Sequence, residues 1–338
     1  MRILHTLSSP AWSGPAEGVA LLADAQRKLG HDVKVAIDRK RTQVTSEEPS
    51  LPYFETMGLL DERHLRLSVK SGPREVWKDV RTLKRFEVDI IHCHFSHDHT
   101  VAFFGRPASA KVIRSIHAPR SLRWSTPRAH GWTVPTQALA THLSPAPCLV
   151  MPALVAQTFG PPSDRGALRK QLGVDGEPLI GMVSTFQASR RHDLAIEAFA
   201  RLKRQCPGAR LVLIGDGGLD AILRIGVLSR GITEAVTFPG YQQGPDFVRW
   251  LQAFDEVWVL GLGNDFSGRA AAQARACGAR VLAVDEGALA AIADEVVVPD
   301  ADAIVRASIA KTRRALPVPG PEEIAAQVIA LYERVRAG

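Results

Sequence analysis

Histidine and carboxylate clusters are the first features of this sequence whose residue types and spacing could bind a metal ion. Four histidines lie close together, namely His92, His94, His97 and His99. In the segment VDIIHCH, strand alternation would place His92 and His94 on one face, where two imidazoles could share an ion. Asp300 and Asp302 form a DxD pair, but they follow VVVP and precede a helical pattern, so helix capping is their predicted role.

A basic segment, PREVWKDVRTLKRF, has the spacing of an amphipathic helix. Val76, Trp77, Val80 and Leu83 recur there at helical intervals. The cations of this segment are Arg74, Lys78, Arg81, Lys84 and Arg85. Such a helix can rest on anionic lipid, with each surface cation contributing about 1 kcal/mol, or it can pack on a core with its polar face in water. The sequence leaves both interpretations open.

The net charge of +7 lies entirely in the first half of the chain. Residues 1–155 hold 21 Lys and Arg against 14 Asp and Glu, whereas residues 156–338 hold 21 of each. No RRM, KH, helix-turn-helix or zinc-finger pattern accompanies the charge, and aromatic residues are only 6%, so nucleic acid is not a predicted partner. We expect an anionic membrane surface or a phosphorylated acceptor instead.

Length and the alternation of strands with helices predict two α/β domains. A chain of 338 residues is about twice the usual size of one hydrophobic core. Strands such as RILHTL and KVIRSI alternate with helical patterns, and the alternation restarts at PLIGMVST after the proline-containing stretch MPALVAQTFGPPSD. The predicted domains are residues 1–155 and 156–338, each a doubly wound parallel sheet. Two such domains facing each other would enclose an interdomain cleft, because these sheets bind ligands beyond the carboxyl ends of their strands.

Three stretches of the second half follow one another in a characteristic order: PLIGMVSTFQASRRHDLAIEAFARLKRQCPGARLVLIGDGG, VTFPGY and FSGRAAAQARACGARVLAV. Together they resemble the retaining glycosyltransferases of family 4, also called glycosyl transferases group 1, and the likeness covers most of the chain. The resemblance implies the GT-B fold, with two facing Rossmann-like domains. It also implies a hexosyltransferase that needs no metal ion or cofactor and uses a UDP- or GDP-linked sugar as its donor substrate.

The resemblance implies that a basic loop binds the donor diphosphate. A departing nucleoside diphosphate needs cations or helix N-termini near its oxygens. Arg190 matches the basic phosphate-binding residue of the family, while Thr185 occupies the position of the preceding family arginine. Arg191 or Arg269 could supply the missing cation, because a guanidinium presents forked donors that suit phosphate.

A second donor-binding segment is implied just before a predicted helix. The family has two glutamates with seven residues between them, and Asp265 and Gln273 occupy their positions. Both side chains can still hydrogen-bond sugar or ribose hydroxyls. Phe266, Ser267 and Gly268 precede the helix, whose free N–H groups could meet the diphosphate. In the alternative interpretation, Asp265 or Ser267 is an ordinary cap and Gln273 a surface residue.

In the first half, the resemblance implies roles for Gly14 and His117. Gly14 lies where the family has a glycine-rich turn near the donor and acceptor. His117, at the end of KVIRSIH, matches a strand-terminal histidine that contacts the reacting sugar or its acceptor. We predict that His117 positions the sugar and stabilises charge.

The predicted activity is transfer of a sugar, with retention, to a cell-envelope glycan or lipid-linked acceptor, as in lipopolysaccharide, capsule or glycolipid synthesis. Two alternatives stay open: a non-catalytic nucleotide-sugar-binding protein, suggested by Thr185, Asp265 and Gln273, and a sugar-nucleotide epimerase of the same general fold. The start MRILHTLSSP lacks the features of a signal peptide. We therefore expect a cytoplasmic protein that associates peripherally with the inner face of the membrane.

Overall fold

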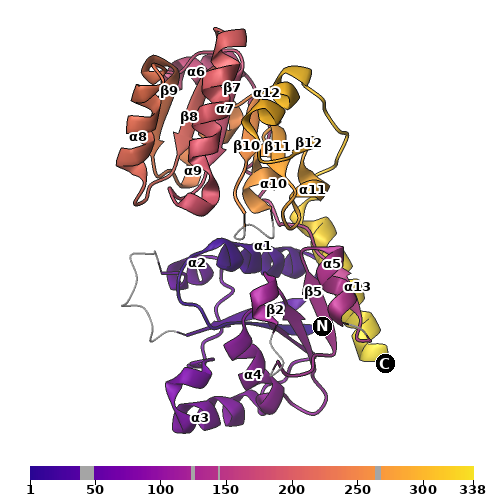
Figure 1. The fold of residues 1–338 in the computed structure, drawn as a ribbon. Helices are drawn as coiled ribbons and strands as arrows, with labels where there is room; N and C mark the ends of the chain where they lie inside the picture. Colours follow the sequence, from indigo (N-terminus) through magenta and orange to yellow (C-terminus); the bar gives the residue numbers. More distant parts are fainter. Residues whose placement is uncertain (39–48, 123–125, 144, 263–267) are drawn as a thin grey trace. The chain divides into compact units, whose positions relative to one another are not determined.

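The computed structural model describes residues 1–38, 49–122, 126–143, 145–262 and 268–338. These residues form two compact units, one of Met1–Ala156 with Pro319–Gly338 and one of Gln157–Val318 (Figure 1). The boundary near residue 156 agrees with the sequence, but the chain's last residues do not belong to the second unit. Their helix packs its apolar face into the core of the first unit, through residues such as Ile324, Val328 and Leu331. A helical pattern indicates an apolar face but not the core that this face will cover.

The first unit contains a six-stranded parallel sheet in the order β2-β1-β3-β4-β5-β6. Its strands are β1 (Arg2–Leu7), β2 (Asp32–Ile37), β3 (Ile90–Cys93), β4 (Lys111–Ser115), β5 (Gly131–Val134) and β6 (Cys148–Val150). Its helices are α1 (Gly14–Lys28), α2 (Leu51–Thr56), α3 (Pro73–Leu83), α4 (Ser96–Gly105), α5 (Gln137–Ala140) and α13 (Pro321–Ala337).

The second unit contains another six-stranded parallel sheet, in the order β12-β11-β10-β7-β8-β9. Its strands are β7 (Leu179–Val183), β8 (Arg210–Ile214), β9 (Val236–Gly240), β10 (Glu256–Val259), β11 (Arg280–Val284) and β12 (Glu295–Val297). Its helices are α6 (Arg165–Leu172), α7 (His192–Gln205), α8 (Asp220–Ser229), α9 (Gly244–Ala253), α10 (Arg269–Ala276), α11 (Leu289–Ile292) and α12 (Ala301–Ala310). The two predicted doubly wound sheets are thus confirmed.

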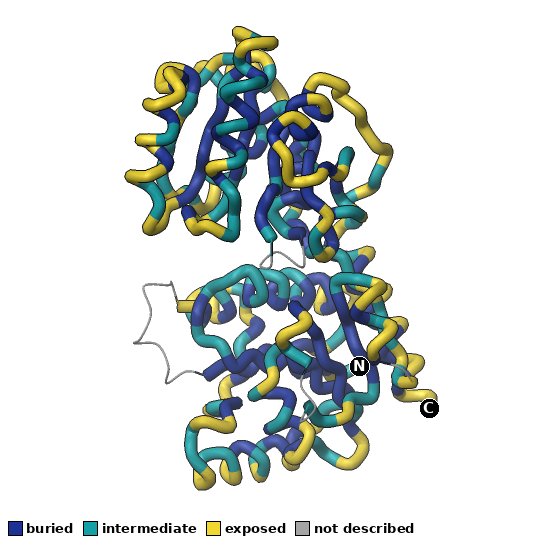
Figure 2. The backbone as a smooth tube through the Cα atoms, viewed as in Figure 1, coloured by how far each residue is buried: buried dark blue, intermediate teal, exposed yellow. Residues whose placement is uncertain are grey.

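Both sheets are buried between helices, as Figure 2 shows by the dark strands and the lighter outer helices. In the second unit, α7 and α12 cover one core and α10 covers the other, so the chain winds in opposite directions from β7. Close packing fixes some residue types. A Cβ on Gly181 in β7 would lie 2.3 Å from the Phe254 ring, so only glycine fits there.

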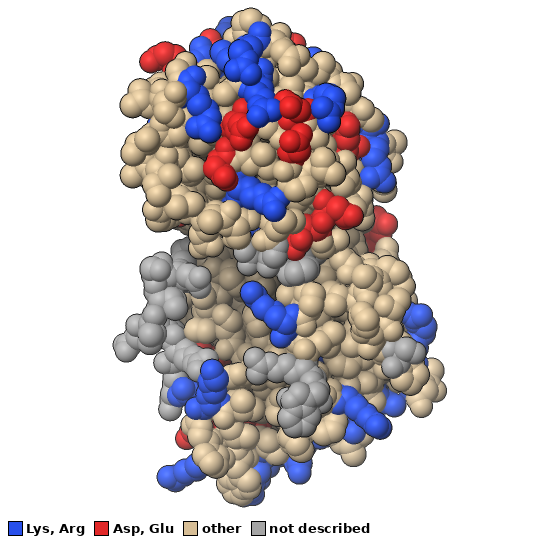
Figure 3. All heavy atoms as spheres, viewed as in Figure 1, with Lys and Arg blue, Asp and Glu red and all other residues tan. Residues whose placement is uncertain are grey.

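The charge is divided between the units much as the sequence predicts. Because residues 319–338 add two arginines and three glutamates, the first unit has a net charge of +6 and the second +1. On the face drawn in Figure 3, basic and acidic side chains mingle over the second unit, whereas basic ones predominate over the first. None of the described helices is both long and apolar enough to cross a bilayer.

Candidate functional site

The strand order of the second sheet reverses between β7 and β10, and this is where doubly wound sheets bind ligands. The segments that follow these two strands meet there. Leu262 N–H donates to the Ser189 carbonyl at 2.9 Å. A Cβ on Gly261 would lie only 3.1 Å from Arg190 Cδ, so the stem of Arg190 lies against the backbone that follows β10. The sheet topology therefore brings the basic loop 185–191 beside the segment that leads to α10.

Arg190 offers an unused donor at this edge. Its Nε is buried and has no hydrogen-bond partner among the described residues. A buried N–H without an acceptor is costly, so a ligand oxygen that reached it would recover a charge-assisted hydrogen bond. Thr185, three residues before the short helix η4 (Ala188–Arg190) begins, is exposed and contributes no charge. The cation that the family has at this position is therefore not replaced by Thr185.

The N-terminus of α7 begins directly after Arg190. Arg191 is the N-cap residue, with a left-handed φ of 59°, and no side chain caps this end. The first-turn N–H groups are therefore available to an anion. His192 is buried with its Nε2 3.2 Å from Ser184 Oγ, and burial, aided by the charge of Arg190, lowers its pKa to about 4. A neutral His192 therefore adds no charge of its own to the loop.

The GDGG turn at residues 215–218 supports this loop. Gly215 and Gly217 both have a φ of 143°, and a Cβ on Gly215 would lie 2.0 Å from the Ser184 carbonyl oxygen. Phe186 N–H donates to the Asp216 carbonyl at 2.6 Å. The glycine-rich turn thus holds residues 184–186 in place by close backbone packing.

The helix α10 begins at the same carboxyl edge. Its N-cap Gly268 has a φ of 63°, and a Cβ there would lie 2.6 Å from Ile292 Cδ1, so glycine is required twice over. Arg269 is the first helical residue. Gln273 is only 2% exposed, so the alternative that treats it as a surface residue is wrong. Asp265, Phe266 and Ser267 lie outside the described residues.

The predicted residues of the first unit occupy the end of β4 and the start of α1. Gly14 is the first residue of α1, after the N-cap Ser13. His117 follows β4, and its ring stacks on His94 with centroids 6.1 Å apart. The Nε2 of His117 is buried and has no hydrogen-bond partner among the described residues.

Electrostatics limit what His117 can do. Burial lowers the pKa of His117 to about 4, and the nearby Arg114 adds to the effect. The imidazole is therefore neutral at pH 7 and can hydrogen-bond a sugar, but it carries no charge with which to stabilise an anion. This environment is compatible with positioning the sugar through a hydrogen bond.

Two buried charged residues near His117 escaped the sequence analysis. Arg114 in β4 is 1% exposed, and its Nε and Nη1 have no partner among the described residues. Asp98 accepts hydrogen bonds from the backbone N–H groups of His94 and Phe95, both at 2.9 Å, and burial raises its pKa to about 6. The arginine in the middle of the apolar strand KVIRSI could have indicated a polar site, because a buried charge is costly unless a partner or a ligand compensates it.

The basic helix forms as predicted, with one correction. All five cations of the segment are exposed, while Val80 and Leu83 face the core. Trp77 does not join them: it is 59% exposed, and the Arg81 guanidinium lies 4.5 Å from its ring centroid. At 100° per residue, Trp77 falls on the cationic side of the helix rather than the apolar one. The helix thus combines a core-packed face with an exposed face of cations and one aromatic ring.

Only part of the histidine cluster predicted from the sequence comes together in the structure. His92 and His94 do share a face, with centroids 4.5 Å apart, and the potential ligand atoms of His5, His92 and His94 lie within 4.8 Å of one another. His97 instead contacts Ser68 Oγ at 2.9 Å. Asp300 caps α12 by accepting from Ala303 N–H at 2.9 Å, which confirms its predicted role.

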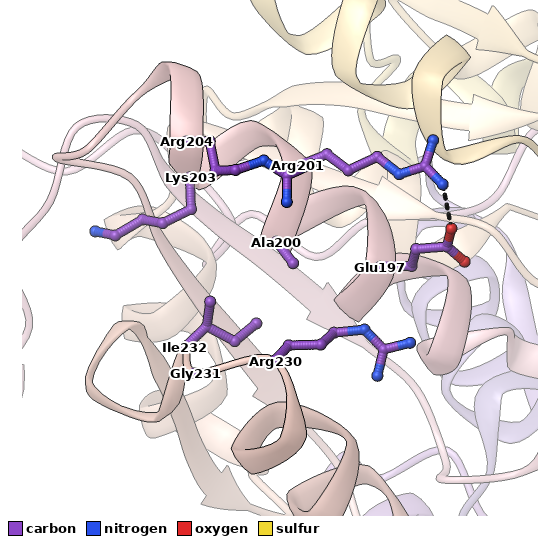
Figure 4. Close-up of a pocket in the computed structure, with 8 residues that line it drawn as sticks. All are labelled: Glu197, Ala200, Arg201, Lys203, Arg204, Arg230, Gly231 and Ile232. Carbon is purple, nitrogen blue, oxygen red and sulfur yellow. Dashed lines mark hydrogen bonds and ion pairs between the residues drawn. The ribbon is translucent and has the colours of Figure 1, made fainter.

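A basic pocket in the second unit, drawn in Figure 4, is separate from this site. It lies by the C-terminal ends of α7 and α8, at the opposite edge of the sheet from the carboxyl ends of the strands. Three of its four cations already have partners. Arg201 pairs with Glu197 and Asp302, Lys203 Nζ donates to the Ala209 carbonyl at 2.9 Å, and Arg230 bonds a backbone carbonyl. The candidate ligand site is therefore the β7–β10 edge.

Comparison with known proteins links both units to one class of enzyme. Residues 164–311 match the family model "Glycosyl transferases group 1", and residues 12–147 match "Glycosyltransferase Family 4". A D-inositol 3-phosphate glycosyltransferase of Segniliparus rotundus is 30% identical over 173 residues, or 48% of this chain and 38% of that protein. A GDP-mannose-dependent monoacylated α-(1-6)-phosphatidylinositol monomannoside mannosyltransferase of Corynebacterium glutamicum is 30% identical over 154 residues, or 44% of this chain and 39% of that one.

Among solved structures, Anabaena Alr3699/HepE in complex with UDP matches with a TM-score of 0.73 and 19% identity, covering 100% of this chain and 99% of that one. This likeness supports the fold. The chain spans about two fifths of the length of the curated relatives above. Because the two family models together cover residues 12–147 and 164–311, the chain belongs to the group 1 glycosyltransferases of the GT-B fold.

Proposed function

We propose that this protein is a retaining glycosyltransferase that moves a hexose from a nucleotide-sugar donor to a cell-envelope glycan or lipid-linked acceptor. The observation that carries the proposal is the β7–β10 edge of the second unit. There a buried Arg190 Nε without a partner, the uncapped N-terminus of α7 and the segment leading to α10 come together. Retention and the class of acceptor rest on the motif resemblance and on the relatives.

The arrangement suits the leaving group of the reaction. When the sugar leaves a nucleoside diphosphate, negative charge develops on the diphosphate oxygens. Arg190 and the N–H groups at the start of α7 are fixed before the substrate arrives, so they need little reorganisation as the charge grows. Mobile surface lysines would pay more conformational entropy for the same contacts. UDP- and GDP-sugars are the donors that we propose.

An acceptor on an anionic surface fits the first unit. Its net charge is +6, and α3 with the two residues that follow it presents five exposed cations beside the exposed ring of Trp77. Cations and an aromatic ring on one helix face are typical of helices that rest on anionic lipid. The names of the two curated relatives above include an inositol phosphate and a phosphatidylinositol mannoside, which agrees in kind with this proposal.

The proposal is tested by a transfer assay. The full chain is incubated with UDP- and GDP-hexoses and with either phosphorylated polyols or anionic glycolipid, and NMR identifies the anomeric configuration of the product. We expect release of the nucleoside diphosphate and a product with the configuration of the donor. Binding without turnover across the panel would favour the non-catalytic alternative, and a donor converted to its sugar epimer would favour an epimerase.

A further inference from the structure

A chain of hydrogen-bonded side chains crosses the core of the first unit and ends next to His117. It links α1, α13 and four strands. Every member is at most 2% exposed. Its members, in order, are Thr133, Ser115, His92, Tyr332, Gln26, His5 and His94.

The contacts along the chain are short. Ser115 Oγ lies 2.7 Å from Thr133 Oγ1 and 2.8 Å from His92 Nε2. His92 Nδ1 lies 2.6 Å from the hydroxyl oxygen of Tyr332, and Gln26 Nε2 donates to that oxygen at 3.2 Å. Gln26 Oε1 lies 2.8 Å from His5 Nε2, and His5 Nδ1 lies 2.9 Å from His94 Nε2.

The donors and acceptors of the chain fit only one direction if all three imidazoles are neutral. Burial lowers the pKa of His5 to about 4 and lowers those of His92 and His94 as well, so none carries a second proton at pH 7. The amide of Gln26 donates through its nitrogen, so Tyr332 must give its own proton to His92 Nδ1. On the other side, Gln26 Oε1 accepts from His5 Nε2–H.

The donor-to-acceptor direction of these hydrogen bonds fixes the tautomer of His94. Because His5 donates through Nε2, its Nδ1 is an acceptor, and His94 must donate to it through Nε2–H. The Nδ1 of His94 is then a bare lone pair, and no described residue bonds it. The ring of His94 stacks on the ring of His117, with centroids 6.1 Å apart.

We propose that Tyr332 is a positioning residue, which acts through Gln26, His5 and the stacked ring of His94 to set the orientation of His117. This inference rests on the proposed function for the importance of His117. The hydroxyl of Tyr332 accepts a hydrogen bond from Gln26 and donates one to His92, so it connects the two halves of the hydrogen-bonded series. A helix from the far end of the sequence thus completes the polar surroundings of His117.

The same geometry argues against an ion among His5, His92 and His94. Every ring nitrogen of the three except His94 Nδ1 already has a hydrogen-bond partner. An ion bound to all three would have to displace contacts with Gln26, Tyr332 or Ser115, or the one between His5 and His94. With neutral imidazoles, these hydrogen bonds satisfy the ring nitrogens without a bound ion.

The test substitutes Tyr332→Phe, which keeps the ring in the core and removes only the hydroxyl. Gln26→Met breaks the next link with little change in volume, and Tyr241→Phe, 65% exposed in the second unit, is the matched control. Long-range ¹H–¹⁵N NMR reports the imidazole tautomers, and kinetics report kcat and the donor KM. We expect one Nε2–H tautomer for His94 in the unmodified protein and a mixture in the first two variants. Their kcat should fall about tenfold with the donor KM nearly unchanged.

The possible outcomes separate the inference from the proposed function. If both core variants keep the tautomer of His94, or lose thermal stability while kcat stays at the level of Tyr241→Phe, the positioning role is overturned. If the tautomers change as expected but the unmodified protein transfers no sugar, the hydrogen-bond chain stands and the proposed function fails.

Discussion

The buried Nε2 of His117 has no partner among the described residues and is available to a substrate, and this predicts how removal of the side chain acts. His117→Ala should lower kcat by roughly 10²-fold, because a positioned hydrogen bond to the reacting sugar contributes most in the transition state. The donor KM should change little, since the groups proposed to hold the diphosphate belong to another loop. Steady-state kinetics measure both. His142→Ala, an exposed residue of the same unit, is the control, and equal kinetics in the two variants would remove His117 from the site.

At single residues, the sequence predicted side chains better than their surroundings. The motifs located Arg190 and His117, because an arginine after one strand and a histidine after another have recognisable positions. The neutrality of His117 and the burial of Arg114, whose Nε and Nη1 have no partner among the described residues, were not predictable, since both depend on residues far away in the sequence. Trp77 was misplaced because apolar character alone suggested the core, while its helical angle puts it with the cations.

At the scale of elements, the packing of β7 depends on a residue without a side chain. Gly181→Ala would bring a Cβ to 2.3 Å from the Phe254 ring, so ring or strand must move. We expect a loss of about 1–3 kcal/mol in the free energy of unfolding, the usual cost of overpacking a core. Gly218→Ala, where a Cβ would meet nothing within 4 Å, is the control. Urea unfolding measures both, and equal midpoints would show that the strand has room to spare.

The helix α3 predicts how the protein meets a membrane. Vesicles with anionic lipid should sediment the full chain at low salt, and binding should weaken as salt rises, since exposed charges are screened over about 10 Å at 0.1 M. Replacing Arg74, Lys78, Arg81, Lys84 and Arg85 by Gln should abolish sedimentation. The control replaces five exposed cations of the second unit, namely Arg204, Arg224, Arg230, Lys311 and Arg313.

If the unmodified chain stays in the supernatant at low salt, the membrane surface is wrong and a soluble phosphorylated acceptor becomes the better proposal. Equal loss of binding in both five-residue variants would show that only the overall charge matters. Neither result would change the assignment of the donor site, which lies in the other unit.

For the strands and most helices, periodicity was sufficient for prediction. The apolar runs of β1, β4, β7 and β8 are short and bounded by polar residues, so sequence and structure agree there. The return of α13 to the first unit was not predictable, because its apolar face would suit either core. Ile324 and its neighbours pack in the core of the first unit, and this packing places α13 there.

For the whole molecule, the buried histidines predict a dependence of stability on pH. Burial lowers the pKa of His5 and His117 to about 4 and that of His99 to about 3, from an ordinary value of 6.5. The unfolded chain therefore binds protons first as the pH falls, and the stability present above about pH 6.5 is lost towards pH 4. Asp98, with its pKa raised to about 6, and Asp79, whose pKa burial also raises, act in the opposite direction, but the buried histidines outnumber them.

We therefore expect the melting temperature to fall between pH 7.5 and pH 5, as measured by calorimetry. Asp98→Asn should make the fall steeper, since it removes a group that takes up a proton more readily when folded. A melting temperature that is constant or rises over this range would mean that these imidazoles are not held neutral in the core.

The binding of nucleoside diphosphates to the β7–β10 edge is tested most directly by calorimetric titration of the full chain with UDP, GDP and the two nucleosides, repeated on Arg190→Ala and on the control Arg204→Ala. Arg204 is an exposed residue at the far end of α7. We predict that at least one diphosphate binds far more tightly than its nucleoside, and that Arg190→Ala loses about 2–4 kcal/mol of binding while Arg204→Ala does not. Equal affinity for diphosphate and nucleoside, or a diphosphate affinity that Arg190→Ala leaves unchanged, would contradict the account.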